Sequence, residues 1–344
     1  MTIAVVNTKV KTTAIGSLPH PNVDSALEYS FRFDIPFLPQ LPIRNPREYM
    51  IPQSLSGLPG LKIQSGGMVM IDLQEWDQKG KDWQEKVKTA FDESKRKPQA
   101  FEDFVPGTDV YSAWFPFLWE IEERKTPLVK IQMAGPLTTQ WAVSLSDGSK
   151  IEKHLDLWST IQNHLLARSI AMIRKVRETG AEVLFYLDEP ALFTFQVDHP
   201  KTLVSFSELG LFIKVLKSEG AKIGLHCCSN TQWEKALALD IDILSLDTNL
   251  SLESLVTYQK ALAQFSMRGG VLSLGVVPTD LSSTQYKDLN GANLAQDLQR
   301  QLSSFPGLIS NCIVTPACGM ALLSPEDSEI IAGLLKSVSK TLTQ

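Results

Sequence analysis

The chain has 344 residues, of which 43% are hydrophobic and 21% are charged, and its formal net charge is -5. These values are typical of a soluble globular protein, and no apolar run approaches the roughly 20 residues that span a bilayer. The only dense basic run is Lys95–Lys97, so a surface for nucleic-acid phosphates is not expected. Residues 1–11 lack a secretory pattern, and two of the four cysteines are adjacent, which predicts a cytoplasmic protein with reduced thiols.

Short, mostly β-branched segments alternate with longer amphipathic ones, a pattern typical of a parallel sheet with helices outside it. We expect eight strands, at residues 12–17, 33–41, 128–136, 182–190, 221–228, 241–248, 269–276 and 311–317. Helices are expected at residues 151–178, 199–218, 231–239, 252–264, 285–303 and 325–343. Eight strands with this alternation predict one α/β domain over residues 1–344, a (β/α)8 TIM barrel.

Residues from about 44 to 125 form a long insertion after the second predicted strand. Within it, Leu58–Gly60 and Gly66–Gly67 favour a hairpin, and Lys79–Lys97 favours a charged helix. Residues 101–119 are rich in Phe, Tyr and Trp. We favour a role for this aromatic segment in capping the bottom of the barrel or in a dimer contact, over a lid above a ligand.

Active sites of such barrels lie at the carboxyl ends of the strands, and here those ends carry sulfur, imidazole and carboxylate groups. Two thiols and an imidazole from separate strands favour a catalytic zinc site, with a carboxylate as a further ligand. The alternative is that these are ordinary buried residues, because free cysteine is among the most buried types. The candidate metal ligands are His226, Cys228, Asp247 and Cys318. Cys227 and Cys312 are expected in the core.

Other residues at the strand ends have both a functional and a structural interpretation. Asp188 and Glu189 could bind an amino group or hold a proton, or cap the helix that follows. Gly16 and Ser17 could direct main-chain N–H groups at a ligand carboxylate. Trp141 could stack on a planar ring, although packing is favoured. The four remaining histidines lack a partner pattern and are expected to be non-catalytic: His20, His154, His164 and His199.

Taken together, these residues resemble the catalytic barrel of the cobalamin-independent methionine synthase family. That family belongs to a superfamily that also holds uroporphyrinogen decarboxylase and zinc-dependent corrinoid methyltransferases. The matching segments, which follow the family order, are Thr12–Pro19, Ala134–Thr138 with Trp141, Leu187–Ala191, His226–Cys228, Asp247 and Thr315–Gly319.

The resemblance implies that His226, Cys228, Cys318 and an acidic ligand hold a zinc ion. This zinc would bind the sulfur of homocysteine as a thiolate. The acidic ligand is usually Glu in the family, where this chain has Asp247. The residues implied in binding the amino acid are Asp188 and Glu48 for the amino group and the backbone of Ile15, Gly16 and Ser17 for the carboxylate. Zinc suits this role because coordination to a dication removes the proton of the thiol and leaves a thiolate that can attack a methyl group.

Two departures from the family bear on the methyl donor. A second, N-terminal barrel that helps to hold folate does not fit in 344 residues, and the family's catalytic His is missing from residues 275–280, where Asp280 stands near its place. A methylcorrinoid donor needs no proton on its leaving group. We therefore predict a short, barrel-only member of the family that methylates homocysteine from methylcobalamin or a corrinoid protein. The alternatives are transfer to another thiol, such as coenzyme M, or a non-catalytic barrel that binds a thiol or corrinoid.

Overall fold

The computed structural model describes residues 9–194 and 200–344. Residues 1–8, which form most of the N-terminal stretch considered above, and His199 lie outside the described residues. None of the described helices is both long enough and apolar enough to cross a membrane.

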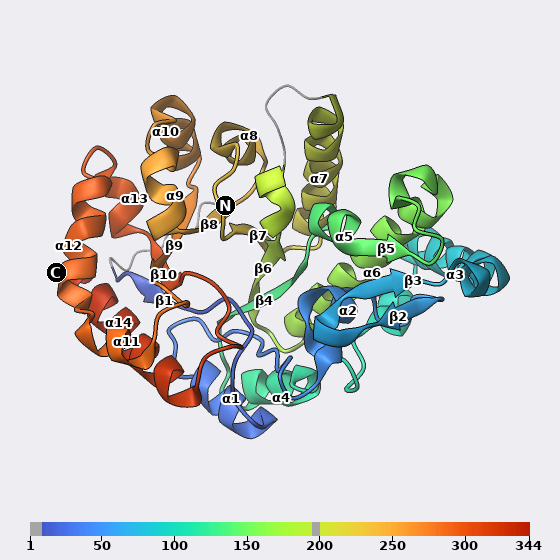
Figure 1. Ribbon diagram of the computed structural model, residues 1–344, viewed down its shortest axis with the longest axis horizontal. Helices are drawn as coiled ribbons and strands as arrows, with labels where there is room; N and C mark the ends of the chain where they lie inside the picture. The colour runs from blue at the N-terminus through green and yellow to red at the C-terminus, as the bar shows by residue number, and fades with distance from the viewer. Residues whose placement is uncertain (1–8, 195–199) are drawn as a thin grey trace.

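A curled sheet of parallel strands forms the centre of the described fold, with helices outside it (Figure 1). Seven strands belong to it, and all neighbouring pairs are parallel. Their order across the sheet is β1 (Lys11–Thr12), β10 (Ile313–Pro316), β9 (Val271–Val277), β8 (Ile243–Asp247), β7 (Lys222–Cys227), β6 (Glu182–Asp188) and β4 (Leu128–Ala134). Because the strands are parallel, their carboxyl ends meet at one edge.

The second predicted strand, residues 33–41, is not regular, so a full eight-stranded barrel is not confirmed. The segment lies between the two edge strands and makes only isolated bridges, from Phe37 to β4 and from Gln40 to Ser17. Its hydrogen bonds reach both edges, because Ile35 donates to Thr12 at one edge and Pro36 accepts from β4 at the other. Pro36 and Pro39 explain the irregularity, since proline has no N–H to donate to a ladder. The confirmed architecture is an α/β fold with a curled, half-barrel sheet.

The strands are buried on both faces, as expected for a parallel sheet covered by helices. A small apolar cluster that includes Leu184, Tyr186 and Ile243 is separate from the main core and fills the concave side of the sheet. Above it, the same side carries polar side chains that are completely buried, among them Lys130 and Gln132 on β4. The concave side is therefore polar toward the carboxyl ends of the strands.

Most of the helices pack on the convex side of the sheet, and they agree broadly with the predicted ranges. Two predicted helices are divided. The predicted range 252–264 falls across the end of one helix at Leu255 and the start of the next at Gln259. The range 285–303 is divided because the side chain of Asn290 accepts hydrogen bonds from the N–H groups of Ala292 and Asn293 and so starts a new helix. The helices are α1 (Val23–Ser30), α5 (Pro136–Ala142), α6 (Leu155–Glu178), α7 (Pro200–Ser218), α8 (Trp233–Ala238), α9 (Thr248–Leu255), α10 (Gln259–Met267), α11 (Ser283–Asp288), α12 (Gly291–Gln301), α13 (Pro306–Ser310) and α14 (Pro325–Thr343), with short 3-10 helices at Ile151–Lys153 and Pro190–Thr194.

The insertion packs beside β4 and α6, at the right of Figure 1. The predicted hairpin is confirmed as an antiparallel pair, to which a third strand from the main body adds in parallel, an addition that was not predicted. Its aromatic segment enters the main core through Tyr111, Trp114 and Phe117. The added strand is β5 (Val143–Leu145). The elements of the insertion itself are β2 (Leu61–Ile63), β3 (Val69–Ile71), α2 (Met50–Leu55), α3 (Leu73–Glu93), α4 (Trp114–Glu123), and 3-10 helices at Pro46–Glu48, Ser65–Gly67 and Pro98–Phe104.

Candidate functional site

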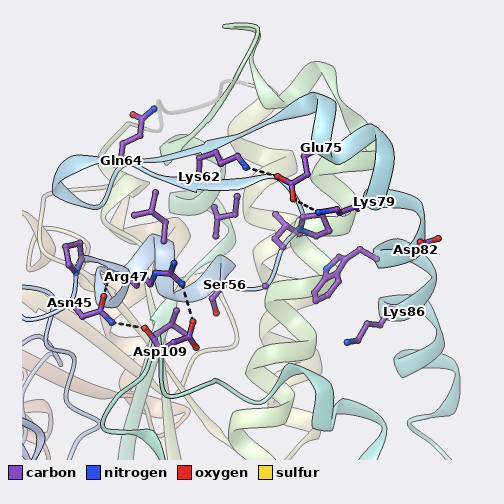
Figure 2. Close-up of a pocket in the computed structure, with 18 of the residues that line it drawn as sticks. Asn45, Arg47, Ser56, Lys62, Gln64, Glu75, Lys79, Asp82, Lys86 and Asp109 are labelled. Carbon is purple, nitrogen blue, oxygen red and sulfur yellow. Dashed lines mark hydrogen bonds and ion pairs between the residues drawn. The ribbon is translucent and has the colours of Figure 1, made fainter.

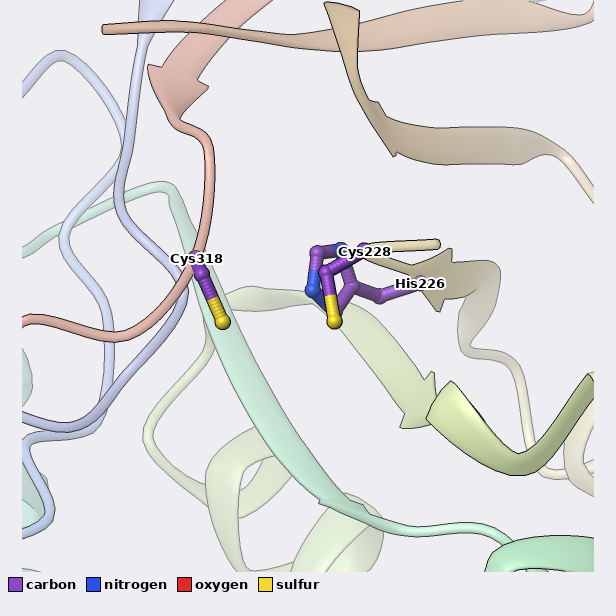
Figure 3. Close-up of side chains that lie close together, drawn as sticks. All are labelled: His226, Cys228 and Cys318. Carbon is purple, nitrogen blue, oxygen red and sulfur yellow. The ribbon is translucent and has the colours of Figure 1, made fainter. Parts of the chain in front are cut away.

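Three of the predicted metal ligands meet at the carboxyl edge of the curled sheet. His226 lies near the carboxyl end of β7, Cys228 follows that strand, and Cys318 follows β10. Their donor atoms all lie within 4.8 Å of one another, although the two cysteines are 90 positions apart in sequence (Figure 3). We call these three residues the triad.

The two thiols of the triad affect each other's acidity. The hydrogen bond between them lowers the pKa of Cys228, since it stabilises the thiolate there. The same bond, together with burial, raises the pKa of Cys318. Cys228 is therefore the more acidic thiol of the pair. A divalent cation would compensate two thiolates at this distance, so the donor set fits a zinc ion.

The imidazole of the triad is buried and its orientation is fixed. His226 Nδ1 lies 3.0 Å from the hydroxyl oxygen of Ser245, on the neighbouring strand β8. This contact leaves the other ring nitrogen for a metal, an arrangement typical of histidine ligands whose second nitrogen is hydrogen-bonded. Sequence analysis did not identify Ser245, although a serine within the apolar strand β8 is an unusual residue that could have drawn attention.

Asp247, the predicted oxygen ligand, is not part of the triad's group of donor atoms among the described residues. Its Oδ1 accepts hydrogen bonds from the N–H groups of Asn249 at 2.8 Å and Leu250 at 3.4 Å, and so caps α9. Asp280 is exposed on the turn after β9. Burial raises the pKa of Asp247, and the charge of Asp280 adds to this effect, so the two carboxylates lie near each other. Both roles remain predictions.

The adjacent acids Asp188 and Glu189 face different surroundings. Glu189 accepts hydrogen bonds from the N–H groups of Leu137 and Thr138 and from the Thr138 hydroxyl, so it holds the start of α5. Asp188 ends β6 beside His226 in the sheet register. Its side chain is buried and its Oδ1 has no hydrogen-bond partner in the described part of the chain. Burial raises the pKa of Asp188, an effect that His226 and Lys130 oppose.

The predicted carboxylate-binding segment lies directly beside the loop that carries Cys318. The carbonyl oxygen of Ser17 accepts a hydrogen bond of 2.9 Å from the N–H of Met320. Gly16 has a φ of 148°, and a Cβ there would lie 2.3 Å from Nε2 of Gln132, so only glycine fits. The carbonyl oxygen of Ile15 accepts a hydrogen bond from Lys130. The segment is thus fixed by contacts on both sides.

Glu48 and Trp141, the remaining predicted substrate residues, differ in burial. Glu48 is buried, and its two carboxylate oxygens accept hydrogen bonds from the N–H groups of Leu41 at 2.8 Å and Ser112 at 3.2 Å. It therefore joins the irregular segment to the insertion. Trp141 is 64% exposed and meets Phe193 edge-on, with ring centroids 6.1 Å apart. A role for either residue in binding a substrate stays a prediction.

The other cysteines and histidines are accounted for within the described structure. Cys227 and Cys312 are buried in the main core, as predicted. His20 and His164 are buried, and burial lowers the pKa of both. His154 contacts the hydroxyl of Ser149 at 2.7 Å. None of these belongs to the triad.

A cavity of about 1060 Å³ lies within the insertion (Figure 2), and no residue of the triad lines it. No predicted site residue lines it. Its charged side chains are largely paired with one another: Glu75 binds Lys62 and Lys79, and Arg47 binds Asp109. Because these side chains are paired with one another, few of the charged groups in the lining are free to bind a ligand. The cavity is therefore not our candidate site.

Comparisons with known proteins give similarity in fold alone. No protein-family model matches the chain, and no curated protein matches it. A methyltransferase from Methanosarcina mazei has a similar structure, with a TM-score of 0.58 and 15% identity over 95% of this chain and 94% of that one. A B12-independent methionine synthase from Shewanella sp. W3-18-1, in complex with selenomethionine, matches with a TM-score of 0.46 and 16% identity over 65% of each chain. The chain thus spans less than two thirds of that second structure.

Proposed function

We propose that the protein is a zinc-dependent methyltransferase that methylates the thiol of homocysteine to give methionine. The observation that supports this best is the triad, which collects two thiols and an imidazole from the carboxyl ends of β7 and β10. His226, Cys228 and Cys318 would hold the zinc, with Asp247 as a further oxygen ligand. When bound there, zinc would lower the pKa of an incoming thiol from its usual value near 8.5 and keep it as a nucleophilic thiolate.

The residues around the triad suit an amino acid. The partnerless Oδ1 of Asp188 is an acceptor for an ammonium group, since a buried carboxylate oxygen without a partner is costly. Glu48 is proposed to assist it, and the backbone of Ile15, Gly16 and Ser17 to bind the substrate carboxylate. An acid at this position favours an amino-acid thiol over a sulfonate thiol such as coenzyme M, which would need cations.

The proposed methyl donor is methylcobalamin or a corrinoid protein. The homocysteine sulfur attacks the methyl carbon with a lone pair, and the bond from that carbon to its carrier breaks, so that the bonding electrons leave with the carrier. The thiol proton passes to solvent, with Asp280 as the nearby exposed base in our proposal. Trp141, exposed at the same edge, is proposed to stack on the planar ring of the donor.

We further propose that residues 35–40 close the curled sheet into the eight-membered barrel of the cobalamin-independent methionine synthase family, with residues 44–125 as an insertion in that single domain. The hydrogen bonds of Ile35 and Pro36 to the two edge strands support the closure. The similar fold of the Methanosarcina mazei methyltransferase supports this proposed assignment.

The test is to incubate zinc-loaded protein with homocysteine and methylcobalamin and to measure methionine. The expected result is methionine formation that is lost on removal of zinc with a chelator and is strongly reduced in Asp188→Asn. No methionine with methylcobalamin, a methylated corrinoid protein or methyl-folate would contradict the proposal. Binding of zinc and homocysteine without transfer would instead indicate the non-catalytic alternative.

A further inference from the structure

Lys130 is an amine buried completely within the curled sheet, on the strand β4. Its Nζ donates hydrogen bonds to the carbonyl oxygen of Ile15 at 2.6 Å and to Oε1 of Gln132 at 2.9 Å. The same atom lies 4.6 Å from the centre of the Tyr186 ring. Burying an amine away from water costs free energy unless the amine is hydrogen-bonded. These contacts therefore determine the orientation of the Lys130 side chain.

The bond to Ile15 fixes the direction of the peptide group between Ile15 and Gly16. In a trans peptide the C=O and the N–H point in opposite directions, and the described residues contain no cis peptide bond. Since the carbonyl of Ile15 faces Lys130 in the interior, the N–H of Gly16 points away from it. The carbonyl of Gly16 is fixed separately by the N–H of Gln40, at 3.0 Å.

We propose that Lys130 is a positioning residue for the carboxylate of the thiol substrate, which it serves by turning the N–H of Gly16 toward the open edge of the sheet. The inference rests on the proposed function, because it requires an amino-acid thiol at the triad. Lys130 is not expected to touch the substrate. The role rests on the hydrogen bond to Ile15, which the amine donates whether it is protonated or neutral.

Three thiols separate this role from a general structural one. Homocysteine carries both the amino group and the carboxylate, 4-mercaptobutanoate lacks the amino group, and 3-aminopropane-1-thiol lacks the carboxylate. Their affinities are measured by calorimetry for zinc-loaded wild type, Lys130→Met and Lys222→Met. Lys222 is the matched control, since it lies at the amino end of β7, away from His226 at the carboxyl end of the same strand.

In Lys130→Met we expect homocysteine and 4-mercaptobutanoate to bind about tenfold more weakly than to the wild type. The affinity for 3-aminopropane-1-thiol should fall by no more than about twofold. Lys222→Met should bind all three as the wild type does. Equal losses for the three thiols, or no loss in Lys130→Met, would overturn the inference.

Two further observations keep the test decisive. If Lys130→Met does not fold, as judged by circular dichroism, Lys130→Gln retains a side-chain N–H donor and should show a smaller loss with the same preference for the carboxylate thiols. A wild type that binds none of the three thiols would contradict the proposed function, and this inference with it. A wild type that binds homocysteine while the variants show no preference contradicts this inference alone.

Discussion

The N–H of Met320 donates a 2.9 Å hydrogen bond to the carbonyl oxygen of Ser17, which joins the loop of Cys318 to the segment after β1. The glycine between Cys318 and Met320 allows this approach, because a Cβ at Gly319 would lie 2.0 Å from the Ser17 hydroxyl. We predict that Gly319→Ala forces the Ser17 hydroxyl to rotate or the loop to shift, which lowers zinc affinity by up to about tenfold and destabilises the fold by at most about 1–3 kcal/mol. Zinc titration and urea unfolding measure both effects.

Gly333→Ala is the control for that substitution. Gly333 lies in α14, and a Cβ there would meet no atom within 4 Å. The change should leave zinc affinity unchanged and raise helix stability slightly, since alanine favours helix. Equal zinc affinities in the two alanine variants would show that the approach of Gly319 to Ser17 does not position Cys318.

The two thiols of the triad should both be needed to retain zinc. We expect Cys228→Ser and Cys318→Ser each to lower zinc occupancy strongly, because a serine hydroxyl remains protonated where a thiol becomes a thiolate. Cys312→Ser is the matched control, since Cys312 is buried in the main core away from the triad. Elemental analysis after dialysis against a weak chelator measures occupancy. Full occupancy in either triad variant would remove that residue from the site.

Sequence alone predicted the triad because parallel strands bring their carboxyl ends to one edge, whatever the separation of His226 and Cys318 along the chain. It failed at residues 33–41, where the apolar pattern suggested a strand but the prolines exclude a regular ladder. Nor could it give the orientation of side chains between strands. The contact of Ser245 with His226, like that of Lys130 with Ile15, depends on the register of neighbouring strands, which no local pattern encodes.

Ser245 should contribute to zinc affinity without contacting the metal. Removing its hydroxyl in Ser245→Ala frees the ring of His226 to rotate, and losses of about 10–100-fold in affinity are typical when such a partner is removed. Ser273→Ala is the matched control, because Ser273 is buried directly opposite Ser245 on β9. Competition with a chromophoric chelator measures both affinities. A loss in Ser273→Ala as large as that in Ser245→Ala would assign the effect to packing.

Lys130 should give the native state a distinct pH dependence. Burial lowers the pKa of Lys130 to about 7, although the charge of Asp188 acts in the opposite direction. In the unfolded chain a lysine has a pKa near 10.4. Between these values the unfolded chain binds a proton that the native state lacks, so the free energy of unfolding rises with pH, by at most about 1.4 kcal/mol per unit. Below pH 7 both states hold the proton and Lys130 adds no slope.

Lys130→Met removes this titration and leaves the other ionisable groups in place. We therefore expect the free energy of unfolding of the wild type, minus that of the variant, to increase from about pH 7 to about pH 10 and to be flat below pH 7. Urea unfolding of the metal-free proteins across this range measures the difference. A neutral amine still donates hydrogen bonds, so the contact with Ile15 should persist above pH 7. A difference that is constant from pH 6 to pH 10 would show that Lys130 stays protonated despite its burial.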